Sequence, residues 1–279
     1  MKIELIPHEP QFTKAIEKMI AADTVSGMLF SRLYRDMQNG CSMIYADGAL
    51  SGVLLRARSG DVYYRMVFID LRMRRKGIGT AVMHMAEEEL VGSTEVLTAF
   101  YNFADGGAVA FAAHLGFQRF YDCTYMEYAG GKQPTLELPV RQYRDADYLE
   151  AEDVRAQAFH RMRVQVGDFP NSVPTQPSEK GRKAWKADAE NFFLYELDGE
   201  IVGVGHLFED EISSVSVRID HQGQGIGSRF VPYLMNVILD RGYACVHLDC
   251  VVGNPARRLY DRLGFQALYT QRFVQKKIG

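Results

Sequence analysis

Two short stretches, QGQGIGSR at 222–229 and RRKGIGTA at 74–81, place glycines between an apolar run and a segment with helical spacing. They lie 148 positions apart (222 − 74), and the tripeptide LGF recurs with the same offset, at 115–117 and 263–265 (263 − 115). A chance turn does not repeat together with its neighbourhood. The repeat therefore predicts two copies of one domain.

The length and composition agree with two ordinary globular domains. The 279 residues are 47% hydrophobic and 24% charged, with a net charge of −3, so the overall charge gives no indication of a nucleic-acid or anionic-membrane partner. We expect domains at 1–131 and 132–279, joined near GGKQPT at 130–135. The four cysteines lack framework spacing, the N-terminus lacks an apolar signal core, and no apolar run could span a bilayer. We expect a cytoplasmic protein without nucleic-acid or membrane partners, and the sequence leaves its oligomeric state open.

The second half shows the order of elements most clearly. Its pattern predicts a β-hairpin at 192–208 with an Asp-Gly turn and a third strand at 211–219. A helix follows the glycines, intact beyond a second turn that Pro232 distorts. A strand at 245–252, a short helix at 254–263 and a strand at 265–273 follow. The first half repeats this order with a hairpin at 42–57, a strand at 62–70, a helix at 78–90, a strand at 95–101, a helix at 107–115 and a strand at 117–128. Each half is predicted to be α+β, with a mixed, mainly antiparallel sheet flanked by helices.

A glycine turn between a strand and a helix is suited to bind an anion. The N–H groups at a helix N-terminus carry partial positive charge, and glycines let the backbone approach a ligand closely. Such a site best accommodates a phosphate or pyrophosphate. Neither G-x-x-x-x-G-K-[ST] nor G-x-G-x-x-G fits these stretches. Both instead read [RQ]-x-x-G-x-G.

With this loop, both halves resemble the GCN5-related N-acetyltransferases (GNAT family), whose pyrophosphate loop is [RQ]-x-x-G-x-[GA]. The family's second mark, A-x-x-L-Y-x-x-x-G-F, is matched by Ala256, Leu259, Tyr260, Gly264 and Phe265. The resemblance covers nearly the whole chain and implies two tandem GNAT domains. It also implies direct transfer of an acetyl group from acetyl-CoA to a primary amine of a small molecule or peptide, without a metal. Two alternatives remain: a tandem enzyme like mycothiol synthase, and a non-catalytic acyl-CoA sensor.

The resemblance also assigns the residues that contact acetyl-CoA. In this family, backbone N–H groups of the strand before the loop hold the acyl group and pantetheine arm, and the loop holds the pyrophosphate. The expected residues are Val215, Val217, Gln222, Gly223, Gln224, Gly225, Ile226, Gly227, Ser228 and Asn254 in the second half, and Val67, Ile69, Arg74, Arg75, Lys76, Gly77, Gly79 and Thr80 in the first.

The resemblance assigns catalysis to the second half. Tyr260 takes the position of the family's general acid, whereas the first half has Ala112 there (260 − 148). Glu211 lies eleven residues before the loop, where the family's base often lies, and the first half has Tyr63 there. Alternation places Glu211 on one strand face with Ser213, Val215 and Val217. Neighbouring acids, Glu209 and Asp210, or a water molecule are alternative bases. The first half is expected to be degenerate, binding acetyl-CoA without turnover or acting as a structural partner.

Two further features stay open at this level. Cys245, His247 and Asp249 alternate onto one strand face with Cys250 opposite, but no fourth metal ligand is evident, so we predict a buried strand and no metal. The segment 167–185 contains three prolines and ends at Trp185, the only tryptophan. It is predicted to be a long loop that shapes the acceptor pocket or simply projects from the surface, and Trp185 has no assigned role.

Overall fold

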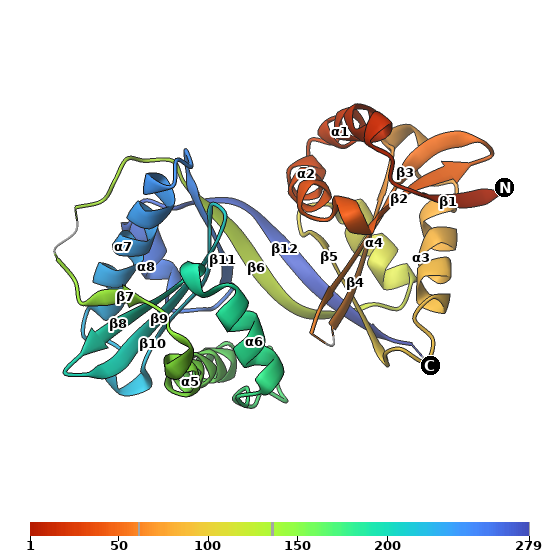
Figure 1. Ribbon diagram of the computed structural model, residues 1–279. Coiled ribbons are helices and arrows are strands. Elements are labelled where there is room, and N and C mark those ends of the chain that lie inside the picture. Colours follow the sequence, from red (N-terminus) through yellow and green to blue (C-terminus); the bar gives the residue numbers. More distant parts are fainter. Residues whose placement is uncertain (61, 135–136, 279) are drawn as a thin grey trace. The chain divides into compact units, whose positions relative to one another are not determined.

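The computed structural model describes residues 1–60, 62–134 and 137–278, so Thr135 of the predicted joint lies outside the described residues. The chain forms two compact units (Figure 1). Unit 1 contains Met1–Asp122 and Tyr269–Gly279, and unit 2 contains Cys123–Leu268. These units do not coincide with the ranges 1–131 and 132–279, because each includes the end of the other half's last strand.

Unit 1 is a mixed sheet with helices on both faces. Its strands follow the order β1-β2-β3-β4-β5-β12. Val67 of β4 packs with α3 on one face, whereas the ring of Phe68 contacts Phe30 of α2 on the other. The elements are β1 (Ile3–Pro7), α1 (Thr13–Ala21), α2 (Gly27–Asp36), β2 (Cys41–Ala46), β3 (Ala49–Ser59), β4 (Val62–Ile69), α3 (Ile78–Glu88), β5 (Val96–Asn102), α4 (Gly106–His114) and β12 (Gln266–Lys277).

Unit 2 repeats this architecture with the strand order β6-β11-β10-β9-β8-β7. On β8, Phe193 and Tyr195 pack under α7 and α8, whereas Phe192 and Leu194 pack with α5 and α6. The two helix pairs therefore cover opposite faces of the sheet (Figure 1). The elements are β6 (Gln118–Tyr128), β7 (Val140–Gln142), α5 (Tyr148–Val166), α6 (Glu179–Ala187), β8 (Phe192–Leu197), β9 (Glu200–Phe208), β10 (Glu211–Val217), α7 (Ile226–Asp240), β11 (Val246–Val251) and α8 (Arg257–Arg262).

The exchanged strands are paired over most of their length. Residues Gln271–Lys277 of β12 lie antiparallel to Asn102–Val96 of β5, so the end of the chain completes the sheet of unit 1. Cys123–Tyr128 of β6 lies antiparallel to β11 and completes unit 2. Such an exchange leaves each sheet with its full set of strands while linking the two halves of the chain.

Segment 167–185 corrects one expectation. Only its first part is a loop, because α6 begins at Glu179 and Ser178 caps it by accepting a hydrogen bond from the Gly181 N–H. Trp185 is buried in this helix, and its ring stacks on Phe192 with centroids 4.1 Å apart. Trp185 is therefore a core residue of unit 2. Helix α7 contains Pro232 and runs without interruption from Ile226 to Asp240.

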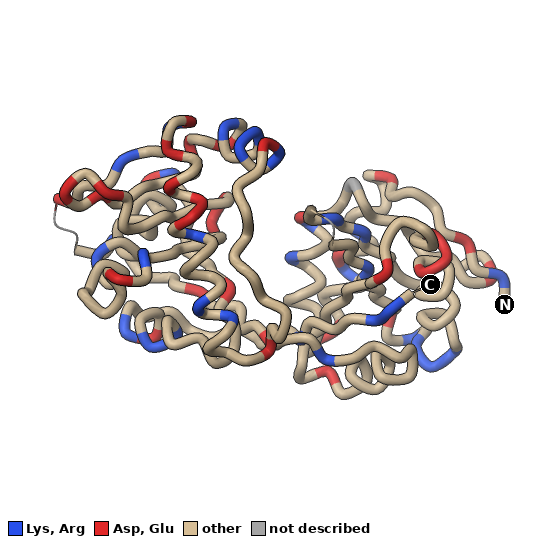
Figure 2. The backbone as a smooth tube through the Cα atoms, turned by 90° about the horizontal axis from the view of Figure 1, so that it is seen from below, with Lys and Arg blue, Asp and Glu red and all other residues tan. Residues whose placement is uncertain are grey.

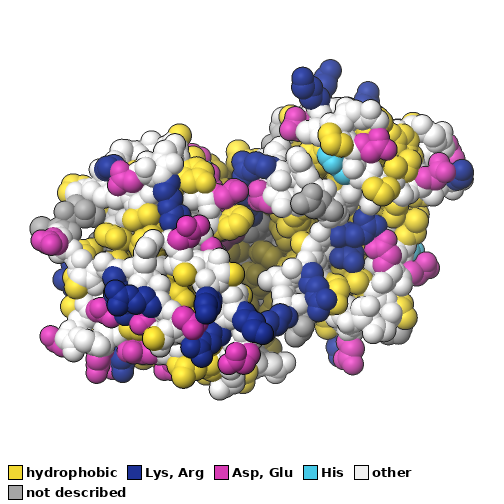
Figure 3. Space-filling view, in the orientation of Figure 1, with side chains coloured by type: hydrophobic (Ala, Val, Ile, Leu, Met, Phe, Trp, Pro, Cys, Tyr) yellow, Lys and Arg dark blue, Asp and Glu magenta, His cyan; other side chains and the backbone are white. Residues whose placement is uncertain are grey.

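Charge is spread over both units. Lysines, arginines, aspartates and glutamates occur throughout the backbone of both units (Figure 2), and both signs are present on the face shown in Figure 3. Within the described residues, no helix combines the length and the apolar character needed to cross a membrane.

Candidate functional site

In each unit, two parallel strands meet at one end and then separate. In unit 2, β10 pairs in parallel with β11 where Glu211 lies opposite His247. In unit 1 the recorded pairing of β4 with β5 places Tyr63 opposite Leu97 and Tyr64 opposite Thr98. Beyond these positions, within the described residues, the strands diverge toward the glycine loops. The divergence opens a cleft in the sheet beside a helix N-terminus.

The two glycine loops have the same backbone conformation. Gly225 and Gly77 precede their helices with φ of 80° and 79°. Two residues earlier, Gly223 has φ 79° and Arg75 has φ 64°. This left-handed region suits glycine and strains other residues, so the first half retains the loop geometry even where it has lost a glycine. A Cβ added at Gly223 or Gly77 would meet no atom within 4 Å, so both loops have open space in front of them.

The first residue of each motif fixes the loop to the strand that precedes it. Gln222 Nε2 donates to the Val217 carbonyl at 2.9 Å, and Arg74 Nε donates to the Ile69 carbonyl at 3.0 Å. These pairs occupy equivalent positions in the two halves (222 − 74 and 217 − 69 are both 148). Arg74 also forms an ion pair with Asp23. In this structure, the glutamine and arginine support the loop, and the backbone N–H groups at the helix start are left to bind an anion.

The third glycine of each motif has a packing role. A Cβ at Gly227 would lie 3.3 Å from Leu259 of α8, and one at Gly79 would lie 3.1 Å from Phe111 of α4. These distances are tighter than ordinary van der Waals contact, so the glycines let the long and short helices of each unit pack closely.

The cleft of unit 2 has a volume of about 480 Å³. Most residues predicted to contact acetyl-CoA line it, as does Tyr260, whereas Gln224 and Glu211 do not. Gln224 instead donates to the Asp220 carbonyl. The predicted residues that do line it are Val215, Val217, Gln222, Gly223, Gly225, Ile226, Gly227, Ser228 and Asn254. Helix α5 forms one wall, through Phe159, Arg161 and Met162 among others, which the sequence did not predict.

The cleft of unit 1 is of similar size, about 520 Å³. Of the predicted residues, Val67, Ile69, Arg74, Arg75, Gly77, Gly79 and Thr80 line it, whereas Lys76 does not. Ala112 lies in its wall at the position that Tyr260 takes in unit 2. Both halves thus have a cleft and a loop. Tyr101 lines the cleft of unit 1, but only unit 2 has a tyrosine at the position of Tyr260.

Tyr260 is held rigidly within unit 2. Its exposed fraction is 7%, and its ring meets Phe265 edge-on with centroids 5.9 Å apart. Burial raises the pKa of Tyr260, and the nearby thiols of Cys250 and Cys123 add to this effect. The hydroxyl therefore stays protonated at neutral pH and can donate a proton into the cleft.

Glu211 lies on the other face of the sheet, which corrects the predicted alternation. Strand β10 contains a β-bulge between Ile212 and Ser214. Ile212, Val215 and Val217 all pack on the α7 side, and the extra residue Ser213 reverses the alternation. Glu211, the neighbour of Ile212, therefore faces the α5 side, where β10 and β11 meet. Strand β4 shows continuous register with β3 and has no such bulge among its described positions.

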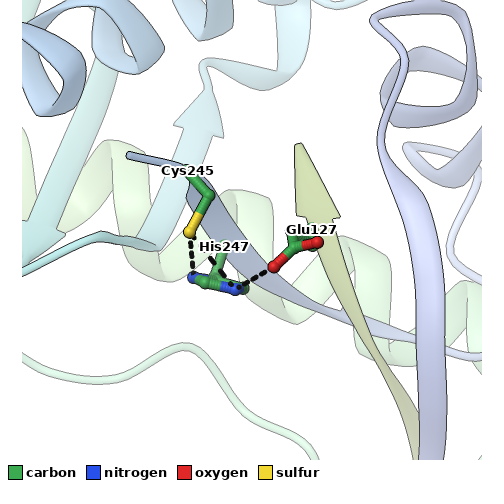
Figure 4. Close-up of side chains that lie close together, drawn as sticks. All are labelled: Glu127, Cys245 and His247. Atoms are coloured by element: carbon green, nitrogen blue, oxygen red, sulfur yellow. Dashed lines mark hydrogen bonds and ion pairs between the residues drawn. The ribbon is translucent and has the colours of Figure 1, made fainter. Parts of the chain in front are cut away.

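Glu127, Cys245 and His247 lie close together (Figure 4), and His247 lies opposite Glu211 on the neighbouring strand. His247 is 9% exposed, its Nδ1 lies 3.2 Å from Asp210 and its Nε2 lies 3.1 Å from Glu127. Cys245 Sγ is 3.9 Å from both ring nitrogens, so three potential metal ligands gather here. Each ring nitrogen thus lies within hydrogen-bonding distance of a carboxylate, one from Asp210 and one from Glu127. Glu127 lies on β6 of the first half, which explains why the sequence did not reveal it.

Comparisons with known proteins agree with this geometry. A model of the acetyltransferase (GNAT) family matches residues 151–265, and a model of the acetyltransferase (GNAT) domain matches residues 9–127. The chain belongs to the GNAT acetyltransferase family. It is a tandem member with one GNAT domain in each half, which confirms the predicted repeat, the α+β fold and the enzyme class. Members of this family use acetyl-CoA and an amine acceptor.

Some similar proteins match this chain across both of its GNAT domains. The chain is 25% identical over 256 residues to a mycothiol acetyltransferase of Clavibacter michiganensis, covering 85% of this chain and 80% of that protein. The fold resembles a GCN5-related N-acetyltransferase from Sphaerobacter thermophilus, with a TM-score of 0.74, 20% identity and coverage of 99% and 96% of the two chains. It also resembles a tandem GNAT protein from the clavulanic acid biosynthesis pathway, with a TM-score of 0.62, 16% identity and coverage of 100% and 99%.

Proposed function

We propose that unit 2 catalyses transfer of an acetyl group from acetyl-CoA to the primary amine of a small molecule or peptide. The observation that carries this proposal is the difference between the two clefts. Tyr260 lines the cleft of unit 2, whereas Ala112 takes its place in unit 1. A proton donor is needed where a thiolate leaves, and alanine cannot supply one.

The residues of unit 2 fit acetyl-CoA. The loop has open space at Gly223, beside the start of a fifteen-residue helix, which suits a pyrophosphate. Val215 and Val217 line the cleft on the diverging strand and suit an uncharged pantetheine arm and a small acyl group. When bound, acetyl-CoA supplies an activated acetyl thioester. The protein's part is to orient it, exclude water and move protons.

Two side chains divide the proton transfers in this proposal. Tyr260 holds a proton in the cleft and donates it to the leaving sulfur. Glu211, on the α5 side where the strands meet, accepts the proton of the attacking amine, directly or through water. Asp210 and Glu127 are nearby on the same side, bonded to His247. This concentration of carboxylates favours a cationic amine acceptor.

Unit 1 is proposed to bind a CoA thioester without transferring its acyl group. Its loop conformation and cleft volume match those of unit 2, but its strand lacks the bulge and its short helix lacks the tyrosine. Both units are therefore proposed to bind a CoA thioester, and only unit 2 is proposed to transfer the acyl group.

A second candidate function differs from the first in the acceptor of the acetyl group. The mycothiol acetyltransferase relative matches across both domains rather than across one. This favours, as the alternative, a mycothiol-synthase-like activity whose acceptor is a larger amine-bearing thiol. Assaying an amino-sugar thiol alongside simple amines and a lysine peptide would separate the two acceptor classes.

The catalytic assignment is tested with Tyr260→Phe. Phenylalanine keeps the ring contact with Phe265 and removes only the hydroxyl, so the fold should be retained. We expect kcat to fall by about 10²–10⁴-fold, the usual contribution of a general acid, with little change in acetyl-CoA affinity. Tyr233→Phe is the matched control, because Tyr233 packs on the same core without lining the cleft. Equal kcat values for both variants would refute the role of Tyr260.

A further inference from the structure

The inner end of the unit 1 cleft contains a buried cation. Arg65 is the first residue of β4 after the last position recorded as paired with β5, so it lies where the two strands begin to separate. It lines the cleft, and only 7% of it is exposed. Val67 and Ile69 lie on the same strand face, between Arg65 and the glycine loop. The cleft therefore runs from the phosphate-binding loop to a guanidinium group.

The existing partners of Arg65 do not satisfy it. Its Nη1 donates to the Tyr64 carbonyl at 2.9 Å, but its buried Nε has no hydrogen-bond partner among the described residues. Glu89 is the nearest carboxylate, with an oxygen 3.9 Å from Nε. That carboxylate is already bound in bidentate fashion by Arg56, at 2.7 and 2.9 Å. Two arginines thus share one glutamate, and the group retains one positive charge.

Unit 2 has a different inner end. The residue equivalent to Arg65 is Ser213 (65 + 148), the extra residue of the β-bulge, and it is exposed. The nearby β10 residues carry no charge: Ile212 packs in the core, Val215 and Val217 line the cleft, and Ser216, which also lines it, donates its hydroxyl to the Val204 carbonyl. An uncharged wall suits an acetyl group, whereas a buried guanidinium with a free donor suits a carboxylate.

We propose that the unit 1 cleft binds a CoA thioester whose acyl group ends in a carboxylate, such as a malonyl or succinyl group. The glycine loop binds the pyrophosphate, and Arg65 binds the acyl carboxylate at the far end. This inference rests on the proposal that unit 1 binds CoA thioesters, and it adds the class of acyl group. The two units then bind different CoA thioesters, and only unit 2 transfers the acyl group of its ligand.

The environment of Arg65 in the free protein favours binding of a ligand carboxylate. The guanidinium is already removed from water in the free protein, so binding adds only the desolvation of the ligand carboxylate. A hydrogen bond to a charged group contributes enough to give a preference of about ten- to a hundredfold over a neutral acyl group. The nearby Glu89 opposes the incoming carboxylate, and its pairing with Arg56 limits that repulsion.

The experiment is calorimetric titration of the full chain carrying Gly225→Glu, which obstructs the phosphate loop of unit 2. The probes are CoA, acetyl-CoA, butyryl-CoA and succinyl-CoA. Butyryl and succinyl groups have the same number of carbons and differ in the terminal carboxylate. Each titration is repeated with Arg65→Met, which keeps the side-chain length and leaves Glu89 paired with Arg56. Arg58→Met is the matched control, because it removes an exposed charge of unit 1 that does not line the cleft.

We expect succinyl-CoA to bind at least tenfold more tightly than butyryl-CoA. This preference should disappear in Arg65→Met and persist in Arg58→Met, while plain CoA binds all three proteins equally. Equal affinity for succinyl-CoA and butyryl-CoA, or a preference that survives Arg65→Met, would overturn the carboxylate assignment while leaving unit 1 a CoA site. A chain that binds none of the four probes would overturn CoA binding by unit 1 altogether. Unfolding curves of each variant show whether the fold is intact.

Discussion

Deleting residues 269–279 should unfold unit 1 and leave unit 2 complete. The deletion removes the part of β12 that belongs to unit 1, and unit 2 keeps all of Cys123–Leu268. The lost segment pairs with β5 over seven positions and includes Val274, which is 2% exposed. It also removes the ion pairs of Arg272 with Asp122 and of Lys276 with Glu87.

The magnitude follows from these contacts. Burial of Val274 contributes about 1.5–3 kcal/mol, and each hydrogen bond to β5 contributes about 0.5–1.5 kcal/mol net. Seven paired positions and one buried valine together give roughly 5–13 kcal/mol, which is comparable to the whole stability of a typical domain, about 5–15 kcal/mol. Val274→Ala is the graded control and should cost only about 1–2 kcal/mol.

Hydrogen exchange of the truncated chain, read peptide by peptide, distinguishes the units. Peptides of β2–β5 and α3 should exchange as in an unfolded chain, while those of β8–β11 and α7 stay protected. Acetyl transfer should persist, because the proposed catalytic residues lie in unit 2. Full protection of unit 1 would refute the structural role of the exchanged strand. Loss of activity with unit 2 still protected would refute the assignment of catalysis to unit 2 alone.

Three further predictions concern single groups. Because burial raises the pKa of Tyr260 above its ordinary value of about 10, its hydroxyl stays protonated as pH rises toward 10; kcat should therefore show no alkaline loss from this group, and a loss that Tyr260→Phe abolishes would contradict its raised pKa. Gly225→Ala forces a side chain onto a residue with φ 80°, which should cost about 1–2 kcal/mol and weaken acetyl-CoA binding, as measured by thermal unfolding and titration. Burial alone would raise the pKa of Asp122, but hydrogen bonds led by Arg272 outweigh burial and lower the pKa. The charged Asp122 therefore stabilises the fold fully above a pH of about 3.9, and this stabilisation is lost as pH falls through the lowered pKa. In acid unfolding curves, the stability of Asp122→Asn should therefore vary less with pH than that of the wild-type chain.

Local patterns in the sequence were sufficient to predict much of each half. The Asp-Gly hairpins, the strand before each loop and the helix after it follow from alternation, helical spacing and glycine placement. The loop itself was predictable because positive φ at Gly223, Gly77 and Gly225 requires residues of that kind. Helices α1, α2, α5 and α6 were not predicted, although each buries side chains in the core; they lie before the repeated stretch of their half and carry no motif.

Several site residues depended on long-range structure. The bulge in β10 inserts one residue, and this single insertion moved Glu211 to the opposite face from the one that alternation predicts. His247 lies between Asp210 and Glu127, which come from different strands and different halves of the sequence. Arg65 was an ordinary strand arginine in the sequence, and only the separation of β4 from β5 placed it at the end of a cleft.

The sequence by itself determined the repeat, the fold class, the two glycine loops and the contrast between Tyr260 in the second half and Ala112 at the same position in the first. These features are local, since they depend on residue type and spacing within a few turns of chain. The tertiary structure decided which sheet each final strand completes. The open edge of a sheet offers the same backbone hydrogen-bonding groups to either final strand. Contacts between side chains far apart in sequence therefore decide which half's sheet each final strand joins. Arg272 and Asp122, which are 150 residues apart and hydrogen-bonded, are one such pair.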